Sequence, residues 1–185
     1  SVNDLKNLFI KFINKVPSFG KSFICIDDKN NQDLLKRIKI KNFYTYGLNV
    51  KAQFRIKNIK QSKDFSEYDL AINLPGKKKI IINAIKVPLL GIHNILNATA
   101  AAAVGLTIGI SKNIIKIGLK EFKGVQRRFN KIFTYRETIF YDDYAHHPTE
   151  IKELLNGVRT AYKKEEIICV FQPHRISRLK DLKKE

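Results

Sequence analysis

The stretch that decides the fold runs from residue 137 to residue 171 and reads ETIFYDDYAHHPTEIKELLNGVRTAYKKEEIICVF. Residues 137–145 predict a strand, and residues 148–163 predict a helix with Pro148 at its first position and Glu150 in its first turn. An apolar stripe along this helix comprises Ile151, Leu154, Leu155, Val158 and Tyr162. Residues 166–171 predict a second strand, short and apolar enough to be buried on both faces. This order predicts a parallel crossover unit of an α/β fold.

Ionisable side chains gather directly after both expected strands. His146 and His147 follow the first strand, and His174 and Arg175 follow the second. Parallel strands joined by a crossover end at the same sheet edge, where open α/β sheets bind ligands. Arg178 lies one turn beyond Arg175 in a helix expected from about residue 175, where each cation opposes the helix dipole by ~0.3–1 kcal/mol. The two arginines therefore predict a carboxylate or phosphate ligand; two solvated arginines are the alternative.

The first 46 residues alternate between helical and strand patterns. We expect a helix over 2–14, a strand over 22–27, a helix near 31–38 that Asp33 helps to start, and a strand over 42–46. This alternation predicts a doubly wound sheet.

Residues 50–87 change character and predict an antiparallel meander. Its expected strands are 52–59, 68–73 and 79–87. Two helices follow, over about 93–109 and 111–122, and Ser111 is a good N-cap and Gly124 a good stop for the second. We expect a domain boundary at 124–129, which divides the chain into residues 1–125 and 126–185.

Composition limits the function classes. The net charge is +18, but the lysines are spread through nearly every segment and no basic motif interleaved with aromatic residues occurs, so a dedicated nucleic-acid function is not predicted. No apolar run approaches the ~20 residues that span a bilayer, so no membrane segment is predicted. Cys25 and Cys169 lie far apart in expected strands, which favours free thiols over a disulfide.

These motifs resemble the Mur ligase family of peptidoglycan synthesis. The resemblance runs from Tyr46 to Arg178 and is carried by GIHNILNA (91–98), GVQRRF (124–129), DDYAHHP (142–148) and PHRISR (173–178). It implies the latter part of the central ATPase domain, which is the end of a doubly wound domain with an antiparallel meander, followed by the start of a Rossmann-like C-terminal domain that binds the amino acid.

The last two motifs favour the branch of the family that joins L-alanine to UDP-N-acetylmuramate through an acyl phosphate, with ATP and magnesium (Mg2+), in the cytoplasm. The alternatives are the branch that reattaches recycled muropeptides, a relative that keeps the fold without catalysis and, more distantly, a basic module that binds polyanions.

The resemblance also implies residue roles. The residues expected to bind ATP are His93, Asn94, Asn97, Arg128 and Asp143. Asn94 and Asn97 share one helix face, and an amide can pair with adenine; simple helix capping is the alternative. Asp143 would accept hydrogen bonds from the ribose hydroxyls. The residues expected around the amino acid are Tyr144, His146, His174, Arg175 and Arg178.

The chain is expected to be a fragment that is inactive by itself. It contains no methionine, and no phosphate-loop motif occurs, since FGKS at 19–22 copies only the tail of that motif. The UDP-sugar domain and most magnesium ligands would lie outside it. His146, His147 and His174 could also suggest zinc, but adjacent histidines after a strand point in different directions, and we expect no metal site here.

Overall fold

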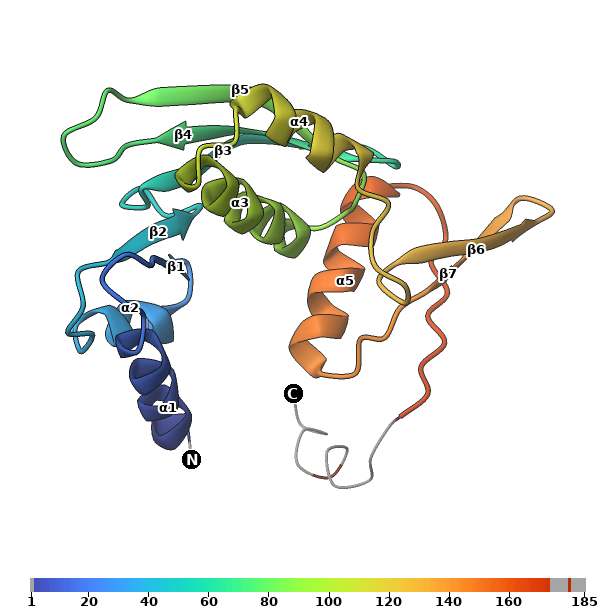
Figure 1. Cartoon of the computed structure of the whole chain (residues 1–185). Helices are drawn as coiled ribbons and strands as arrows, with labels where there is room; N and C mark the ends of the chain where they lie inside the picture. The colour runs from blue at the N-terminus through green and yellow to red at the C-terminus, as the bar shows by residue number, and fades with distance from the viewer. Residues whose placement is uncertain (1, 174–179, 181–185) are drawn as a thin grey trace.

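The computed structural model describes residues 2–173 and residue 180. Its central element is a five-stranded mixed sheet in the order β1-β2-β3-β4-β5 (Figure 1). Helices α3 and α4 cover one face of this sheet, and α1 and α2 lie beside the β1 edge. The bounds are Val2–Asn14 (α1), Ser22–Cys25 (β1), Lys29–Leu35 (α2), Phe43–Gly47 (β2), Phe54–Gln61 (β3), Ser66–Ile72 (β4), Ile80–Val87 (β5), Ile92–Thr107 (α3) and Lys112–Glu121 (α4).

The sheet changes direction where the sequence pattern changes. Strands β1, β2 and β3 are parallel, with Ser22 opposite Phe43 and Tyr46 opposite Phe54. Strands β3, β4 and β5 are antiparallel, and exposed lysines 77–79 lie in the turn between β4 and β5. The predicted end of a doubly wound sheet, continued by an antiparallel meander, is therefore confirmed.

The core lies between this sheet and α3. The β4 residues Tyr68 and Leu70 have no exposed surface, nor does Ile95 on α3. Small residues of α3, including Ala102 and Ala103, are also fully buried, because only small side chains let a helix lie this close to a sheet. Ser111 caps α4 as predicted, since its side chain accepts a hydrogen bond from the Ile114 N–H.

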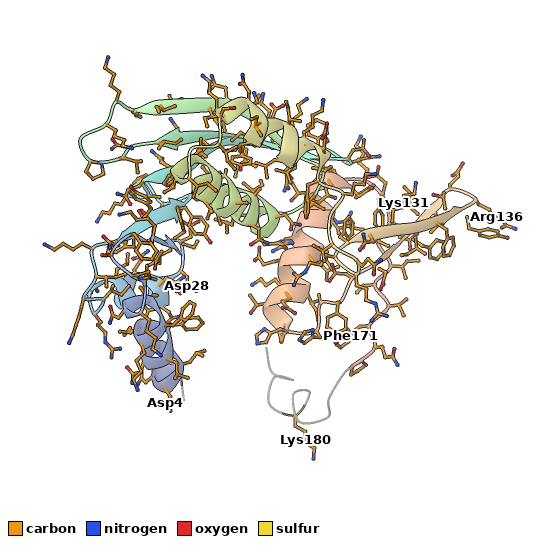
Figure 2. The ribbon with its side chains drawn as sticks, in the orientation of Figure 1. Asp4, Asp28, Lys131, Arg136, Phe171 and Lys180 are labelled. Carbon is orange, nitrogen blue, oxygen red and sulfur yellow. The ribbon has the colours of Figure 1, made fainter. Side chains whose placement is uncertain are left out.

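Helix α2 begins earlier than predicted. Its N-cap is Asp28, whose Oδ1 accepts hydrogen bonds from the N–H groups of Asn30 (2.6 Å) and Asn31 (3.4 Å); Figure 2 labels Asp28 at this end of the helix. Asp33 lies inside the helix and pairs with Lys6 and Lys36 instead. The prediction that Asp33 helps to start the helix is wrong, because the preceding aspartate already satisfies the free N–H groups.

We expect Asp28→Ala to lower the free energy of unfolding by about 1 kcal/mol, since it leaves two N–H groups without their acceptor. Asp33→Ala is the matched control and should change it by less than about half as much, because exposed ion pairs contribute little. Urea unfolding followed by circular dichroism measures both. Equal losses in the two variants would contradict the assignment of the cap.

The second part of the chain contains a β-hairpin and one long helix. The hairpin comprises β6 (Asn130–Tyr135) and β7 (Thr138–Asp142), and the helix is α5 (Pro148–Ala161). Figure 2 labels Lys131 and Arg136 on the hairpin, which extends away from the central sheet. Pro148 is at the start of α5 as predicted, and His147 with Glu150 forms a capping box there.

The predicted strand over 166–171 is not formed, and strand β6 was not predicted. Residues 167–173 have no regular structure, and Ile168 and Val170 are 77% and 93% exposed. A strand needs a neighbour to pair its N–H and C=O groups, and the only partner of β7 among the described residues is β6. The expected parallel crossover, and with it the convergence of two strand ends on one edge, is therefore not seen.

Candidate functional site

The N-terminus of α3 forms one side of the site. Its N-cap is Gly91, which provides no side chain to cap the helix and has φ +92°. This positive φ and a close approach both require glycine, since a Cβ here would lie 2.6 Å from Cε1 of His93. Gly91 thus lets the His93 ring fold back over the backbone that precedes the helix.

The two asparagines of this turn are placed differently. Asn94 Nδ2 donates to the carbonyl of Leu90 (2.7 Å) and lies 3.1 Å from Nε2 of His93. Asn94 is therefore not the N-cap, and the capping alternative is wrong for this residue. Asn97 lies one turn further along the helix and is exposed.

His93 lies near charged residues of the second part of the chain. Burial lowers its pKa, Asp143 and Glu153 act to raise it, and Arg128 acts to lower it. The imidazole is therefore neutral at pH 7. If Nε2 accepts from Asn94, the proton is on Nδ1, which is buried and has no hydrogen-bond partner among the described residues.

Asp143 directly follows strand β7 and is hydrogen-bonded to the segment that links the two parts of the chain. Its Oδ2 accepts from the N–H of Phe129 (2.8 Å), and its Oδ1 accepts from the N–H of Ala145 (2.6 Å). Arg127 and Phe129 have positive φ values of 57° and 52°, which are uncommon for residues other than glycine. Arg128 is exposed and lies between these two residues with positive φ. Such strain is often found at functional sites.

A glycine contact brings the two sides together. Gly157 on α5 is the one buried residue of that helix, and a Cβ on it would lie 3.0 Å from Cα and 3.2 Å from N of Gly91. The backbones of α5 and of the α3 N-terminus therefore approach closely, and this approach places His93 near Asp143. Neither Gly91 nor Gly157 was identified as a site residue from the sequence. For Gly157 there was one signal, since a glycine in the middle of a helical pattern often has a packing or functional reason.

The residues expected around the amino acid are only partly described. Tyr144 is 58% exposed and its ring contacts that of His146, with 5.3 Å between centroids. His146 Nδ1 lies 2.9 Å from the Tyr144 carbonyl oxygen. Burial acts to raise the pKa of Glu150, but the N–H groups of His146 and His147 outweigh it and lower that pKa. His174, Arg175 and Arg178, as well as the helix expected around them, lie outside the described residues.

A metal site is not found where the histidines cluster. Within residues 2–173 and 180, no three His, Cys, Asp or Glu side chains are grouped so that they could hold an ion. His147 Nδ1 accepts from the N–H of Thr149 and acts as the helix cap. Because no such group of ligands is present among these residues, they do not fit a magnesium ion by themselves.

The chain matches two known domain families. Residues 1–105 match the Mur ligase middle domain, and residues 127–185 match the Mur ligase glutamate ligase domain. The chain belongs to the Mur ligase family. The junction of Gly124 to Phe129 thus lies between or at the edge of the two matched segments.

Similar proteins narrow the class further. The chain is 78% identical over all 185 residues to the UDP-N-acetylmuramate–L-alanine ligase of Pelagibacter ubique, of which it spans 40%. The crystal structure of the UDP-N-acetylmuramate–alanine ligase of Thermotoga maritima matches with a TM-score of 0.63 and 28% identity, covering 83% of this chain and 38% of that one. A ligase structure named MurF from Acinetobacter baumannii matches with a TM-score of 0.69 over 83% of this chain and 32% of that one, and at 21% identity it shows the fold.

Proposed function

We propose that this chain is part of an ATP-dependent ligase that joins L-alanine to UDP-N-acetylmuramate. The whole protein would phosphorylate the muramate carboxylate, and the amine of L-alanine would attack the acyl phosphate, releasing ADP and phosphate. The 78% identity to the Pelagibacter ligase supports this substrate pair. Within that protein we assign residues 1–125 to the central domain and residues 126–185 to the C-terminal domain, and we place it in the cytoplasm.

The observation that carries the proposal is the close approach of α5 to the N-terminus of α3 at Gly157 and Gly91, which brings the two parts that contain the motifs together. His93, Asn94 and Asn97 would contact the adenine, and the neutral His93 ring would do so without a charge. Asp143 would bind the ribose hydroxyls. Each of its oxygens already accepts one backbone N–H but has a second lone pair for a further donor. Arg128 would stabilise phosphate charge, since its guanidinium always carries a proton.

The amino acid would be held by the second part of the chain. Tyr144 and His146 would form the pocket wall, and Arg175 and Arg178, with His174 beside them, would bind the carboxylate of alanine. Anchoring that carboxylate leaves the amine directed at the acyl phosphate, and such positioning can supply several kcal/mol of the barrier reduction. Magnesium would neutralise the phosphates of ATP through ligands outside the described residues.

A chimera tests the proposal directly. Residues 1–185 replace the matching segment of the Pelagibacter ligase, and phosphate release from ATP is followed with UDP-N-acetylmuramate and L-alanine, the tripeptide or no acceptor. We expect release that requires L-alanine. Arg175→Lys should raise the KM for L-alanine about tenfold or more, because lysine keeps the charge but loses the planar fork, whereas the matched surface change Arg136→Lys should not. Release that requires the tripeptide would instead assign the segment to the recycling branch, and no release with either would contradict the function.

A further inference from the structure

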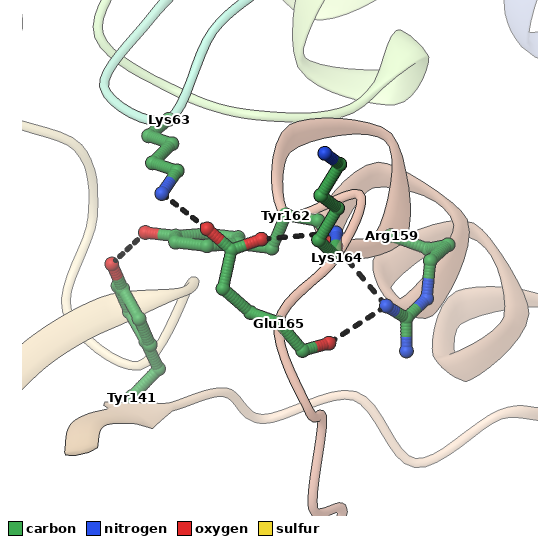
Figure 3. A network of polar contacts seen from close by, with 6 residues as sticks. All are labelled: Lys63, Tyr141, Arg159, Tyr162, Lys164 and Glu165. Carbon is green, nitrogen blue, oxygen red and sulfur yellow. Dashed lines mark hydrogen bonds and ion pairs between the residues drawn. The ribbon is translucent and has the colours of Figure 1, made fainter. Parts of the chain in front are cut away.

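A polar cluster connects the central sheet to the second part of the chain at a distance from the residues assigned above. Lys63, in the turn between β3 and β4, forms an ion pair with Glu165, which follows α5 (Figure 3). Lys63 Nζ also lies 5.5 Å from the centroid of the Tyr162 ring. One side chain of the first part thus contacts two residues of the second, which are 102 and 99 positions away along the chain.

Hydrogen bonds that do not involve Lys63 also hold Glu165 in place. Its Oε2 accepts from the backbone N–H of Lys164 (3.1 Å), and its carbonyl accepts from Nη1 of Arg159 (2.8 Å). The same Nη1 donates to the carbonyl of Tyr162 (3.1 Å). Because these bonds already restrict the loop after α5, pairing with Lys63 costs less side-chain entropy than an isolated pair would.

The contacts continue from this cluster to Asp143. The hydroxyl groups of Tyr162 and Tyr141 lie 2.6 Å apart, and the Tyr141 ring stacks on Phe129, with 4.2 Å between centroids and an interplanar angle of 3°. Phe129 in turn donates its N–H to Asp143. A continuous series of contacts therefore runs from the β3–β4 turn to the carboxylate assigned to the ribose.

We propose that Lys63 and Glu165 form a clasp that sets the orientation of the second part of the chain on the first, and that Lys63, Glu165, Tyr162 and Tyr141 are positioning residues for Asp143. The link to Asp143 as a nucleotide ligand rests on the proposed function; the clasp itself does not. The Lys63 and Glu165 side chains are 56% and 41% exposed, so the pair adds little to stability. Its effect should be on orientation.

The ionisation states of the pair support this role. The hydrogen bond to Glu165 raises the pKa of Lys63, and the same bond lowers the pKa of Glu165. Both groups are therefore charged throughout the neutral range. Concentrated salt, which screens exposed charges, should loosen the clasp, whereas a modest change of pH around 7 should not.

A distance measurement in the 185-residue chain tests the clasp. Spin labels are placed on Lys112→Cys in α4 and Lys152→Cys in α5, both exposed, after replacement of Cys25 and Cys169 by serine. We expect a narrow distance distribution between the labels, which Lys63→Glu broadens or shifts because Glu165 then repels it. The exchange Lys63→Glu with Glu165→Lys should restore the narrow distribution, and 1 M NaCl should broaden it in the parent chain.

The controls separate orientation from folding and from net charge. Lys78→Glu, in the turn between β4 and β5, makes the same change of charge away from the clasp and should leave the distances unchanged. Tyr162→Phe keeps the ring beside Lys63 but loses the bond to Tyr141. Thermal unfolding should be nearly the same in all variants. Unchanged distances in Lys63→Glu, failure of the exchange to restore them, or equal broadening in Lys78→Glu would each overturn the clasp.

Enzyme kinetics then test the positioning role. In the chimera, Lys63→Glu should raise the KM for ATP about fivefold with a smaller change in the KM for L-alanine, and the charge exchange should restore it. Tyr162→Phe should raise the same KM less. A KM for ATP that stays constant while the distances change would refute the link to Asp143 and leave the clasp standing. An inactive unmutated chimera would contradict the proposed function, and the distance results would still decide the clasp.

Discussion

Asp143→Asn should raise the KM for ATP at least tenfold in the chimera, a loss of about 1.4 kcal/mol of binding free energy or more. The carboxylate accepts one backbone N–H on each oxygen, from Phe129 and from Ala145. An asparagine has one carbonyl oxygen, so its amide NH2 would face one of these donors. The substitution therefore removes both the ribose acceptor and one of the bonds that orient the side chain.

The same variant should also lose stability. A buried or half-buried N–H left without an acceptor costs about 1–3 kcal/mol, measured as a lower free energy of unfolding in urea. Asp142→Asn is the matched control, because the neighbouring carboxylate is exposed and should change neither quantity appreciably. A KM for ATP that rises equally in both variants would point to net charge and not to Asp143 as the ribose ligand.

Gly91→Ala should lower the free energy of unfolding more than a Gly→Ala substitution at any other described glycine with positive φ that borders the site. Its φ of +92° and ψ of 147° lie in a region that is essentially restricted to glycine, at a cost of about 1–3 kcal/mol for other residues. The new Cβ would also lie 2.6 Å from Cε1 and 2.8 Å from Nδ1 of His93. The ring must therefore move, and we expect the KM for ATP to rise together with the loss of stability.

Gly109→Ala separates these two causes. Gly109 has the same φ of +92°, but no atom lies within 4 Å of the position of its Cβ. It should lose stability through the backbone alone and keep its KM for ATP. Urea unfolding of the chain and kinetics of the chimera give the two quantities. If Gly91→Ala behaves like Gly109→Ala in both, contact with His93 has no part in the site.

Elements with their own local signals were predictable from the sequence. The helix over 2–14 has the predicted bounds, and the strands of the meander differ from the prediction by only a few residues, because each has an apolar pattern and a clear turn. Ser111 and Pro148 mark the starts of α4 and α5 through local capping and backbone preferences, which do not depend on distant residues. The change from parallel to antiparallel pairing followed from the same patterns.

Elements that depend on a distant partner were not predictable in this way. Residues 166–171 have the composition of a buried strand, but no strand in the described part of the chain pairs with them, and their apolar side chains are largely exposed. Figure 2 labels Phe171 at the end of this segment. Strand β6 was missed because its polar and apolar residues gave no clear period, and it exists by pairing with β7.

The candidate site was likewise predictable in its motif residues but not in its long-range contacts. The motif residues His93, Asn94 and Asp143 could be selected by resemblance, and the structure brings His93 and Asp143 near each other. The contacts that join them could not be selected, since Gly91 with Gly157 and Lys63 with Glu165 are separated by 66 and 102 positions. Whether these motif residues bind ATP stays a prediction.

No helix among the described residues is both long and apolar enough to cross a membrane.

The contact between Gly91 and Gly157 has a mechanical consequence. Gly91 and Gly157 approach each other backbone to backbone, so no side chains interlock at this point. This contact limits how closely the two parts can approach, but it supplies no side-chain packing that would fix the angle between them. If the clasp of Lys63 and Glu165 sets that angle, a change of ionic strength should alter the angle between the two parts more than their separation.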